Sequence, residues 1–282
     1  MSKSIVITGC SSGFGRLTGL YLARQGWHVF ATVRKEADRE SLQAEAAEAG
    51  CAEHLQPVIC DITDAGQVAA LSQKVAEVTA QLDALVNNAG TAFPAPLELL
   101  GLDELRSQLE INLIGHLAVT QALLPSLKAA GGMIINVSSV GGRIAMPILG
   151  AYNISKFALE ALSDVLRVEL APFGVRVVVI EPGSSDTAIW NTSRRRASGR
   201  LQAVAGQSPY LLLINAIEKF SRKSAANGFP PQLFADTVLK ILNNPHPRAR
   251  YAIPGDVARS ILLRKLLPDA IWDRILRRSL KW

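Results

Sequence analysis

The chain has 282 residues, 49% of them hydrophobic and 19% charged, a balance that excludes a fibrous or disordered protein and suits one globular domain with a full core. Its three cysteines lack disulfide or zinc spacing and its four histidines lack metal-ligand spacing, so we expect no metal site and a reducing compartment. The net charge of +6 gathers late in the chain without interleaved aromatic residues, which argues against nucleic-acid binding.

The beginning of the chain predicts a strand rather than a signal peptide. Ser4 leads directly into Ile5-Val6-Ile7, an apolar run that is too short for secretion. No stretch approaches the roughly 18 uninterrupted apolar residues of a membrane span. We therefore expect a soluble, cytoplasmic protein, at most peripheral at a membrane surface.

Short runs rich in Val and Ile alternate with longer helical patterns along the chain. The expected strands cover residues 5–7, 29–31, 57–59, 84–86, 133–137 and 175–180. Near-continuous apolar runs are typical of strands buried on both faces, and helix-length connections allow right-handed crossovers. The pattern predicts the α/β class, with a doubly wound Rossmann-type parallel sheet that binds ligands beyond the carboxyl ends of its strands.

A glycine-rich turn follows the first expected strand. Such a turn before a helix lets the backbone approach a pyrophosphate, while the helix N-terminus supplies free N–H groups. An ordinary tight turn is the alternative, which the flanking strand and helix disfavour. The residues expected to contact a dinucleotide here are Gly9, Ser11, Ser12, Gly13, Phe14 and Gly15.

The end of the second expected strand indicates which cofactor is used. NAD-binding folds usually carry an acidic residue there for the ribose 2′-hydroxyl, but this chain has Val33 followed by Arg34. A guanidinium group pairs well with a 2′-phosphate. We predict NADP(H); a merely solvated Arg34 would leave the missing acid unexplained.

Tyr152 is the one tyrosine followed four residues later by a lysine, Lys156. On a helix this spacing places both side chains on one face, where an ammonium group favours the ionised phenol. Ser139 lies thirteen residues upstream of Tyr152. Alone, the Tyr-Lys pair also fits a plain amphipathic helix, and the neighbouring Ser138 competes for the role of Ser139.

Together these motifs resemble the classical short-chain dehydrogenase/reductase family, motif by motif over residues 1–187. The same order of motifs includes Asn87-Asn88-Ala89-Gly90, Asn112, Ser138-Ser139 and Glu181-Pro182-Gly183. The resemblance implies hydride transfer at a carbinol carbon with Tyr152 exchanging the proton. It implies that Lys156 lowers the tyrosine pKa and holds the nicotinamide ribose, that Ser139 positions the substrate oxygen, and that Asn112 anchors a water.

The resemblance also implies further cofactor contacts. Asp61 would hold the adenine amino group, with Ile62 beside it, and the turn after the fourth strand would pass the adenine ribose. The nicotinamide end would meet the segment after the sixth strand, together with Tyr152 and Lys156. These further contacts are Asn88, Ala89, Gly90, Pro182, Gly183 and Thr187.

We expect a single domain over residues 1–282, with a core (1–183), a mobile substrate lid (184–230) and a C-terminal extension (231–282). Much apolar surface in the later parts predicts a hydrophobic pocket. The arrangement resembles the hydroxysteroid and retinol dehydrogenase-like members, which act on steroids, retinoids and lipid-like alcohols. The apolar residues concerned are Ile189, Trp190, Tyr210 to Ile214, Phe220, Phe229 and Leu233.

After Pro268 the chain predicts an amphipathic basic helix. One interpretation places it on an anionic membrane surface; the other docks it on the protein or across a subunit interface. A homodimer or homotetramer is expected from the family resemblance alone. The apolar side of the helix carries Ile271, Trp272, Ile275, Leu276 and Leu280, and its basic side carries Arg274, Arg277, Arg278 and Lys281.

The leading hypothesis is therefore an NADP(H)-dependent oxidoreductase of hydrophobic secondary alcohols and carbonyls. A second hypothesis keeps the chemistry but assigns a polar substrate, such as a sugar or an acyl thioester. A third is a cofactor-binding regulator without turnover. Because Asn112, Ser139, Tyr152 and Lys156 are all present, the third is disfavoured.

Overall fold

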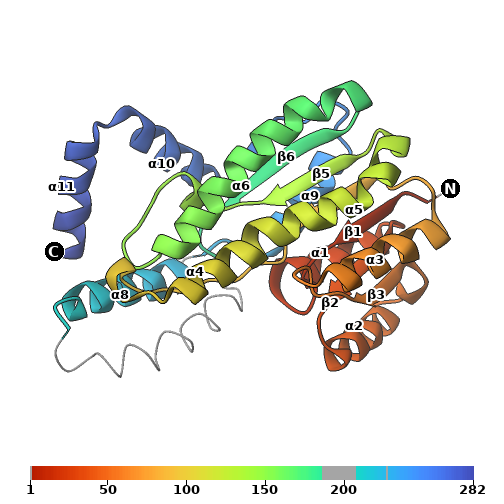
Figure 1. Cartoon of the computed structure of the whole chain (residues 1–282), viewed down its shortest axis with the longest axis horizontal. Coiled ribbons are helices and arrows are strands. Elements are labelled where there is room, and N and C mark those ends of the chain that lie inside the picture. The colour runs from red at the N-terminus through yellow and green to blue at the C-terminus, as the bar shows by residue number, and fades with distance from the viewer. Residues whose placement is uncertain (1, 186–207, 227) are drawn as a thin grey trace.

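A seven-stranded parallel sheet forms the middle layer of the molecule, in the order β3-β2-β1-β4-β5-β6-β7 (Figure 1). The computed structural model describes residues 2–185, 208–226 and 228–282. The reversal of strand order between β1 and β4 confirms the predicted doubly wound fold. The strands are β1 (Ser4–Ile7), β2 (His28–Val33), β3 (Leu55–Ile59), β4 (Ala84–Asn87), β5 (Met133–Val137), β6 (Arg176–Pro182) and β7 (Arg250–Ile253).

Six of these strands match the predicted runs, and the seventh was not predicted. Strand β7 pairs in parallel with β6, with Arg250 opposite Val179 and Ile253 opposite Pro182. It is an edge strand whose residues are mostly half-buried, so it lacks the continuous apolar run that marks the inner strands. The segment assigned to a C-terminal extension thus contributes a strand to the sheet itself.

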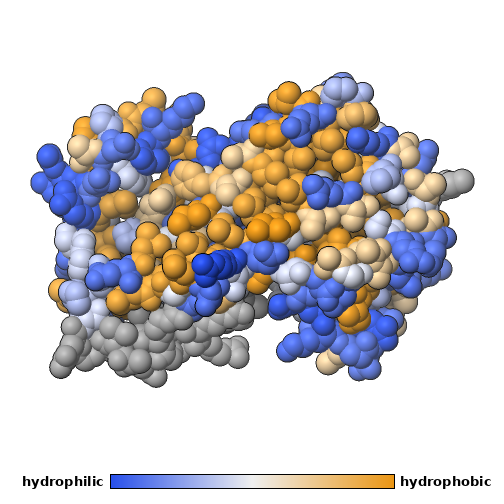
Figure 2. Space-filling view, in the orientation of Figure 1, coloured by the Kyte–Doolittle hydropathy of each residue, from blue (hydrophilic) through white to orange (hydrophobic). Residues whose placement is uncertain are grey.

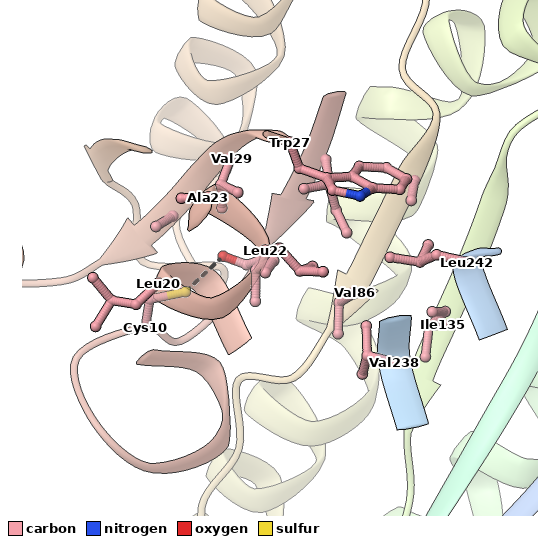
Figure 3. Packing of buried hydrophobic residues seen from close by; sticks show 14 of the residues in the cluster. Cys10, Leu20, Leu22, Ala23, Trp27, Val29, Val86, Ile135, Val238 and Leu242 are labelled. Atoms are coloured by element: carbon pink, nitrogen blue, oxygen red, sulfur yellow. Dashed lines mark hydrogen bonds between the residues drawn. The ribbon is translucent and has the colours of Figure 1, made fainter. Parts of the chain in front are cut away.

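Helices cover both faces of the sheet. On one face α1 (Gly13–Arg24), α2 (Glu36–Glu48) and α9 (Gln232–Leu242) enclose the first part of the core. On the other face α3 (Ala65–Val78), α5 (Gly115–Ala130) and α6 (Gly150–Glu169) enclose the second. Figure 3 shows Val238 and Leu242 of α9 directed toward Val86 and Ile135 of the central strands. Helix α9 therefore belongs to the core, although it lies late in the chain.

The remaining α-helices in the part of the chain that the structure describes lie beyond the carboxyl ends of the strands. They are α4 (Leu102–Leu109), α8 (Leu211–Ala226), α10 (Gly255–Leu266) and α11 (Asp269–Leu280). A third apolar cluster joins α8 to the end of α11, where Leu280 packs with Ile148, Leu213, Ile214 and Ile217. Helices α10 and α11 form an arm that leaves the body after β7 and returns toward α8 (Figure 1). In the part of the chain that the structure describes, no helix is long and apolar enough to cross a membrane.

The predicted lid is described only at its two ends and in α8. Thr187, Ile189 and Trp190 lie outside the described residues. The two described ends meet, because the Phe229 amide donates to the Ser184 carbonyl and Ser185 Oγ donates to the Phe229 carbonyl. This pairing holds the residues that directly follow β6 against Phe229.

Candidate active site

The carboxyl ends of the central strands open into one cleft of about 290 Å³. Strand ends in a parallel sheet converge on one edge, so motifs that are distant in sequence line the same cavity. The predicted cofactor residues that line it are Gly9, Ser11, Ser12, Gly13, Phe14, Arg34, Asp61, Ile62, Asn88, Ala89, Gly90, Tyr152, Lys156, Pro182 and Gly183. Gly15 lies behind the turn, and Thr187 lies outside the described residues.

The glycine turn packs so tightly that two positions require glycine. Gly9 has φ +74°, and a Cβ there would lie 2.8 Å from the Ala89 Cα. A Cβ at Gly15 would clash with Asn88 Nδ2 and lie 2.5 Å from the Gly9 carbonyl oxygen. Asn88 Nδ2 donates to the carbonyls of Thr8 (2.8 Å) and Gly9 (3.2 Å), which ties the turn to the end of β4.

The N-terminus of α1 has the properties of an anion site. Ser12 is its N-cap residue, and its side chain makes no capping hydrogen bond. The first turn of α1 contains no acidic residue, so the positive end of the helix dipole faces the cleft uncompensated. The turn therefore fits a pyrophosphate group.

Two charged residues mark the far end of the cleft. Arg34 is exposed directly after β2, next to the buried Val33, and no ion pair holds it among the described residues. Asp61 follows β3, where its Oδ1 accepts from the amide (3.0 Å) and the hydroxyl (2.8 Å) of Thr63. A guanidinium and an oriented carboxylate thus face the same space.

At the opposite end, Tyr152 and Ser139 lie together. Tyr152 is in the first turn of α6 and is 7% exposed, and its phenol is hydrogen-bonded to the Ser139 side chain. Burial raises the pKa of Tyr152 above its usual value, and the bond to Ser139 opposes this. Ser139 is also the N-cap of the 3₁₀ turn Val140–Gly142, because its Oγ accepts from the Gly141 amide at 3.0 Å. The neighbouring Ser138 Oγ is buried without a hydrogen-bond partner in the described chain, which favours Ser139.

Lys156 is buried one helical turn beyond Tyr152. Its Nζ donates to the Val137 carbonyl at 2.8 Å and lies 5.8 Å from the centre of the Tyr152 ring. Burial lowers the pKa of Lys156 to about 8, and the charge of Glu160 acts in the opposite direction. The lysine is therefore close to its titration range at neutral pH.

Asn112 lies just behind the cleft wall, in a π-helical turn, Glu110–Ile114, between α4 and α5. Its Nδ2 donates to the Thr91 carbonyl and to Ser155 Oγ, each at 3.0 Å, and its Oδ1 accepts from the Thr91 amide at 2.9 Å. A Cβ at Gly90 would lie 3.6 Å from Asn112 Oδ1 and 4.0 Å from Lys156 Nζ. The glycine therefore leaves the space between the amide and the ammonium open.

Comparison with known proteins identifies the family. The family described as short chain dehydrogenase matches residues 3–198. The chain belongs to this family. It is an oxidoreductase, and members of the family bind a nicotinamide cofactor.

Among relatives of this short-chain dehydrogenase is human 17-beta-hydroxysteroid dehydrogenase type 6, which is 34% identical over 98% of this chain and 88% of its own length. Retinol dehydrogenase 5 of Mus musculus is 36% identical over 96% of this chain and 87% of its own length. The crystal structure of a short-chain dehydrogenase from Streptomyces avermitilis superposes with a TM-score of 0.78 at 25% identity, covering 98% of this chain and 97% of that one. The chain resembles the hydroxysteroid and retinol dehydrogenase members of the family.

The structure of this short-chain dehydrogenase also adds cleft residues that the sequence analysis did not single out. Thr91 lines the cleft and is held from behind by both Asn112 and Gln108. Gln108 and Asn112 are polar residues four positions apart on one helix face, and this spacing could have indicated that they bind the same backbone segment. The other added lining residues are Thr32, Cys60, Ile111, Val137 and Ser185.

His116 contacts the backbone of the cleft residue Ala89. It is a buried residue of α5. Its Nε2 lies 2.6 Å from the Ala89 carbonyl oxygen. Burial, with the charge of Lys156, lowers the pKa of His116 to about 3, so the neutral ring donates from Nε2.

Proposed function

We propose that this short-chain dehydrogenase uses NADP(H) to interconvert a hydrophobic secondary alcohol and its carbonyl compound. The observation that carries the proposal is that one continuous cleft has Arg34 at one end and the Tyr152–Ser139 pair at the other, with the glycine turn along its wall. A dinucleotide that spans this distance brings its adenosine phosphate and its reactive ring to opposite ends.

Arg34 supports the preference for NADP(H). It is exposed, adjoins the cleft, and stands where a carboxylate would repel a 2′-phosphate. Charge-assisted pairing of a guanidinium with a phosphate is among the stronger polar contacts. Asp61 and Ile62 would contact the adenine, and the helix N-terminus after Gly13 would hold the pyrophosphate.

NADP(H), when bound in this cleft, would supply or accept the hydride at the carbon of the substrate. In reduction, Tyr152 gives its hydroxyl proton to the carbonyl oxygen, and in oxidation the Tyr152 phenolate takes the proton from the alcohol. Ser139, already hydrogen-bonded to Tyr152, donates to the same oxygen and fixes its position. In each direction one hydride and one proton are transferred, so the reaction balances.

Tyr152 needs a nearby cation for this role, because burial alone raises its pKa. Lys156 is on the same face of α6 and carries that charge when protonated. Its ammonium also has donors left for the ribose hydroxyls. The open space at Gly90, between Asn112 and Lys156, fits a water that would pass the proton to solvent.

A buried apolar cluster near the start of α6 supports an apolar substrate. Leu213, Ile214 and Ile217 of α8 pack around Ile148, which is four residues before Tyr152. The names of the relatives refer to hydroxysteroids and retinol, which are apolar alcohols. A polar metabolite is the competing substrate class, and a regulator without turnover is the competing function.

An exposed apolar stripe on α6 supports a homodimer. Ile154, Phe157, Val165 and Val168 are 42–72% exposed and lie on one helical face. Figure 2 shows an apolar surface over α5 and α6. A stripe of this kind, on helices that face solvent, suits an isologous contact between two copies.

Exposed apolar and basic residues on the arm of α10 and α11 support peripheral contact with a membrane. Leu262, Leu263 and Leu266 are 54–71% exposed on the outer side of α10, and Ile271 and Ile275 on α11 are also exposed. Exposed basic residues flank them: Arg259, Lys265, Arg274, Arg277, Arg278 and Lys281. Apolar side chains beside cations favour an anionic bilayer surface.

The test begins with fluorescence titration of NADPH and NADH, followed by NADPH oxidation against steroid, retinoid, aliphatic and sugar carbonyls. We expect tighter NADPH binding and turnover of apolar carbonyls. Preference for sugars would support the polar substrate class. Tyr152→Phe should abolish turnover and keep cofactor binding; a biological activity that survives this change unaltered would support the regulator.

A further inference from the structure

A cluster of buried charges lies behind the catalytic end of the cleft. Its two carboxylates belong to Glu160 of α6 and Glu181 of β6, whose side chains are 8% and 4% exposed. Arg250 Nε lies 2.9 Å from Glu160 Oε2 and 3.5 Å from Glu181 Oε1. Arg143 Nη1 lies 3.8 Å and 3.3 Å from the same two oxygens. The mechanism proposed above uses none of these four side chains.

Each element of this cluster also carries part of the active site. Glu160 follows Lys156 by one turn of α6, and Glu181 precedes the point where β6 enters the cleft. Arg143 directly follows the 3₁₀ turn whose N-cap is Ser139. The cluster therefore fixes the positions of the catalytic serine and lysine relative to each other.

The packing at Gly142 shows how closely these parts approach. A Cβ at Gly142 would lie 3.1 Å from the Lys156 carbonyl oxygen and 3.2 Å from Glu160 Cγ. The backbone of the Ser139 turn thus rests directly on the stretch of α6 from Lys156 to Glu160. A glycine is needed for this contact.

The ionisable groups around Lys156 differ in how much charge they carry near neutral pH. The Lys156 ammonium is buried against a neutral acceptor, the Val137 carbonyl, and Glu160 is the carboxylate that raises its pKa. Burial and the neighbouring Glu160 raise the pKa of Glu181 to about 7, so Glu181 is only partly charged near neutral pH. His116 on α5 is neutral there.

The last carboxylate of the cluster is farther from the lysine. Asp164 lies two turns of α6 beyond Lys156, is 46% exposed, and is held by Arg167 and Arg250, each at 2.7 Å. Solvent screens its charge. Of the two carboxylates on this face of α6, Glu160 is thus the buried one and the one nearer to Lys156 in sequence.

We propose that Glu160 is a positioning residue of the active site: its carboxylate, fixed by Arg250 and Arg143 one helical turn from Lys156, keeps the Lys156 ammonium charged beside the Tyr152 phenol. Glu160 acts through Lys156 and touches neither substrate nor cofactor. An ionic cluster is rarely needed for stability, since apolar residues of equal volume often replace one without loss. The inference rests on the proposed function of Tyr152 as acid and base.

The test is an NMR titration of the Lys156 side chain, followed through the chemical shift of its Cε atom and assigned by comparing each protein with its own Lys156→Arg counterpart. Glu160→Gln is expected to lower the pKa of Lys156 by at least about one unit, because the ammonium loses the carboxylate that raises its pKa. Asp164→Asn, on the same helix and on the same arginine, is the matched control and should leave the titration unchanged. An unshifted titration in Glu160→Gln would overturn the proposal.

A second variant covers the case in which Glu160→Gln does not fold. Glu181→Gln removes the partly charged neighbour and leaves Glu160 paired with both arginines, so the Lys156 titration should not move downward; a downward shift would overturn the assignment to Glu160. In turnover, Glu160→Gln should shift the rising limb of alcohol oxidation to higher pH and lower kcat with little change in KM. Because the titration needs no turnover, it also separates a failure of this inference from a failure of the proposed function.

Discussion

The Nε2 atom of His116 lies 2.6 Å from the carbonyl oxygen of Ala89, so a buried neutral imidazole holds the backbone of a cleft residue. Its Nδ1 has no hydrogen-bond partner in the described chain. A proton added at Nδ1 would therefore create an unpaired buried charge close to Lys156.

This arrangement predicts acid sensitivity of the fold. The pKa of His116 is lowered from the ordinary histidine value of 6.5 to about 3 by folding, so the unfolded chain binds the proton more readily and stability falls as pH drops below 6.5. The loss is at most about 1.4 kcal/mol per pH unit. Between pH 6.5 and 5, urea unfolding should show the wild type losing about 1.6 kcal/mol more than His116→Gln. Equal losses in both proteins would contradict the prediction.

Gly15→Ala should weaken NADPH binding by at least about tenfold, because the new Cβ meets Asn88 Nδ2 and the Gly9 carbonyl and displaces the turn. Fluorescence titration measures the effect. Gly255→Ala is the matched control, since a Cβ there meets no atom within 4 Å. Unchanged binding in Gly15→Ala would show that the turn does not hold the cofactor.

Arg34→Ala should raise the Kd for NADPH by about 10- to 100-fold and leave the Kd for NADH unchanged, because only the 2′-phosphate loses its charged partner. Arg39→Ala removes a cation of α2 that is paired with Glu36 and serves as the control. If the binding of NADPH and of NADH weakened equally, Arg34 would not be the basis of a preference for NADP(H).

Val165→Arg should convert a dimer to a monomer in analytical ultracentrifugation. Val165 is 52% exposed in the middle of the α6 stripe, and two copies of the new charge would face each other across a two-fold contact. Circular dichroism checks that the fold is retained. A wild type that sediments as a monomer would exclude this interface.

Leu262→Asp combined with Leu263→Asp should abolish sedimentation with phosphatidylserine vesicles, since both side chains are exposed on the outer side of α10. Neutral phosphatidylcholine vesicles should bind the wild type less, because the basic residues of the arm then lack a partner. Val78→Asp alters an equally exposed apolar residue at the end of α3 and should bind normally. If the wild type itself remains in solution, the membrane interpretation is wrong.

Much of the fold could be predicted because its information is local. The first six strands are short runs rich in branched apolar residues, and most of them are buried on both faces. Strand β7 escaped prediction because its pairing with β6 depends on position at the sheet edge rather than on its own sequence. The two helices of the arm are separated at Pro268, which the sequence indicated as a helix start.

The sequence by itself determined the parts of the site that short-range geometry encodes. A four-residue spacing places Tyr152 and Lys156 on one helix face, and glycines at fixed offsets shape the turn after β1. Only the tertiary structure decided which distant groups surround them. Glu160 and Arg250 are ninety residues apart in sequence yet share a hydrogen bond, because parallel packing of β6 and β7 against α6 brings them together. Burial of such charges depends on every neighbouring element, so no local pattern in the chain specifies it.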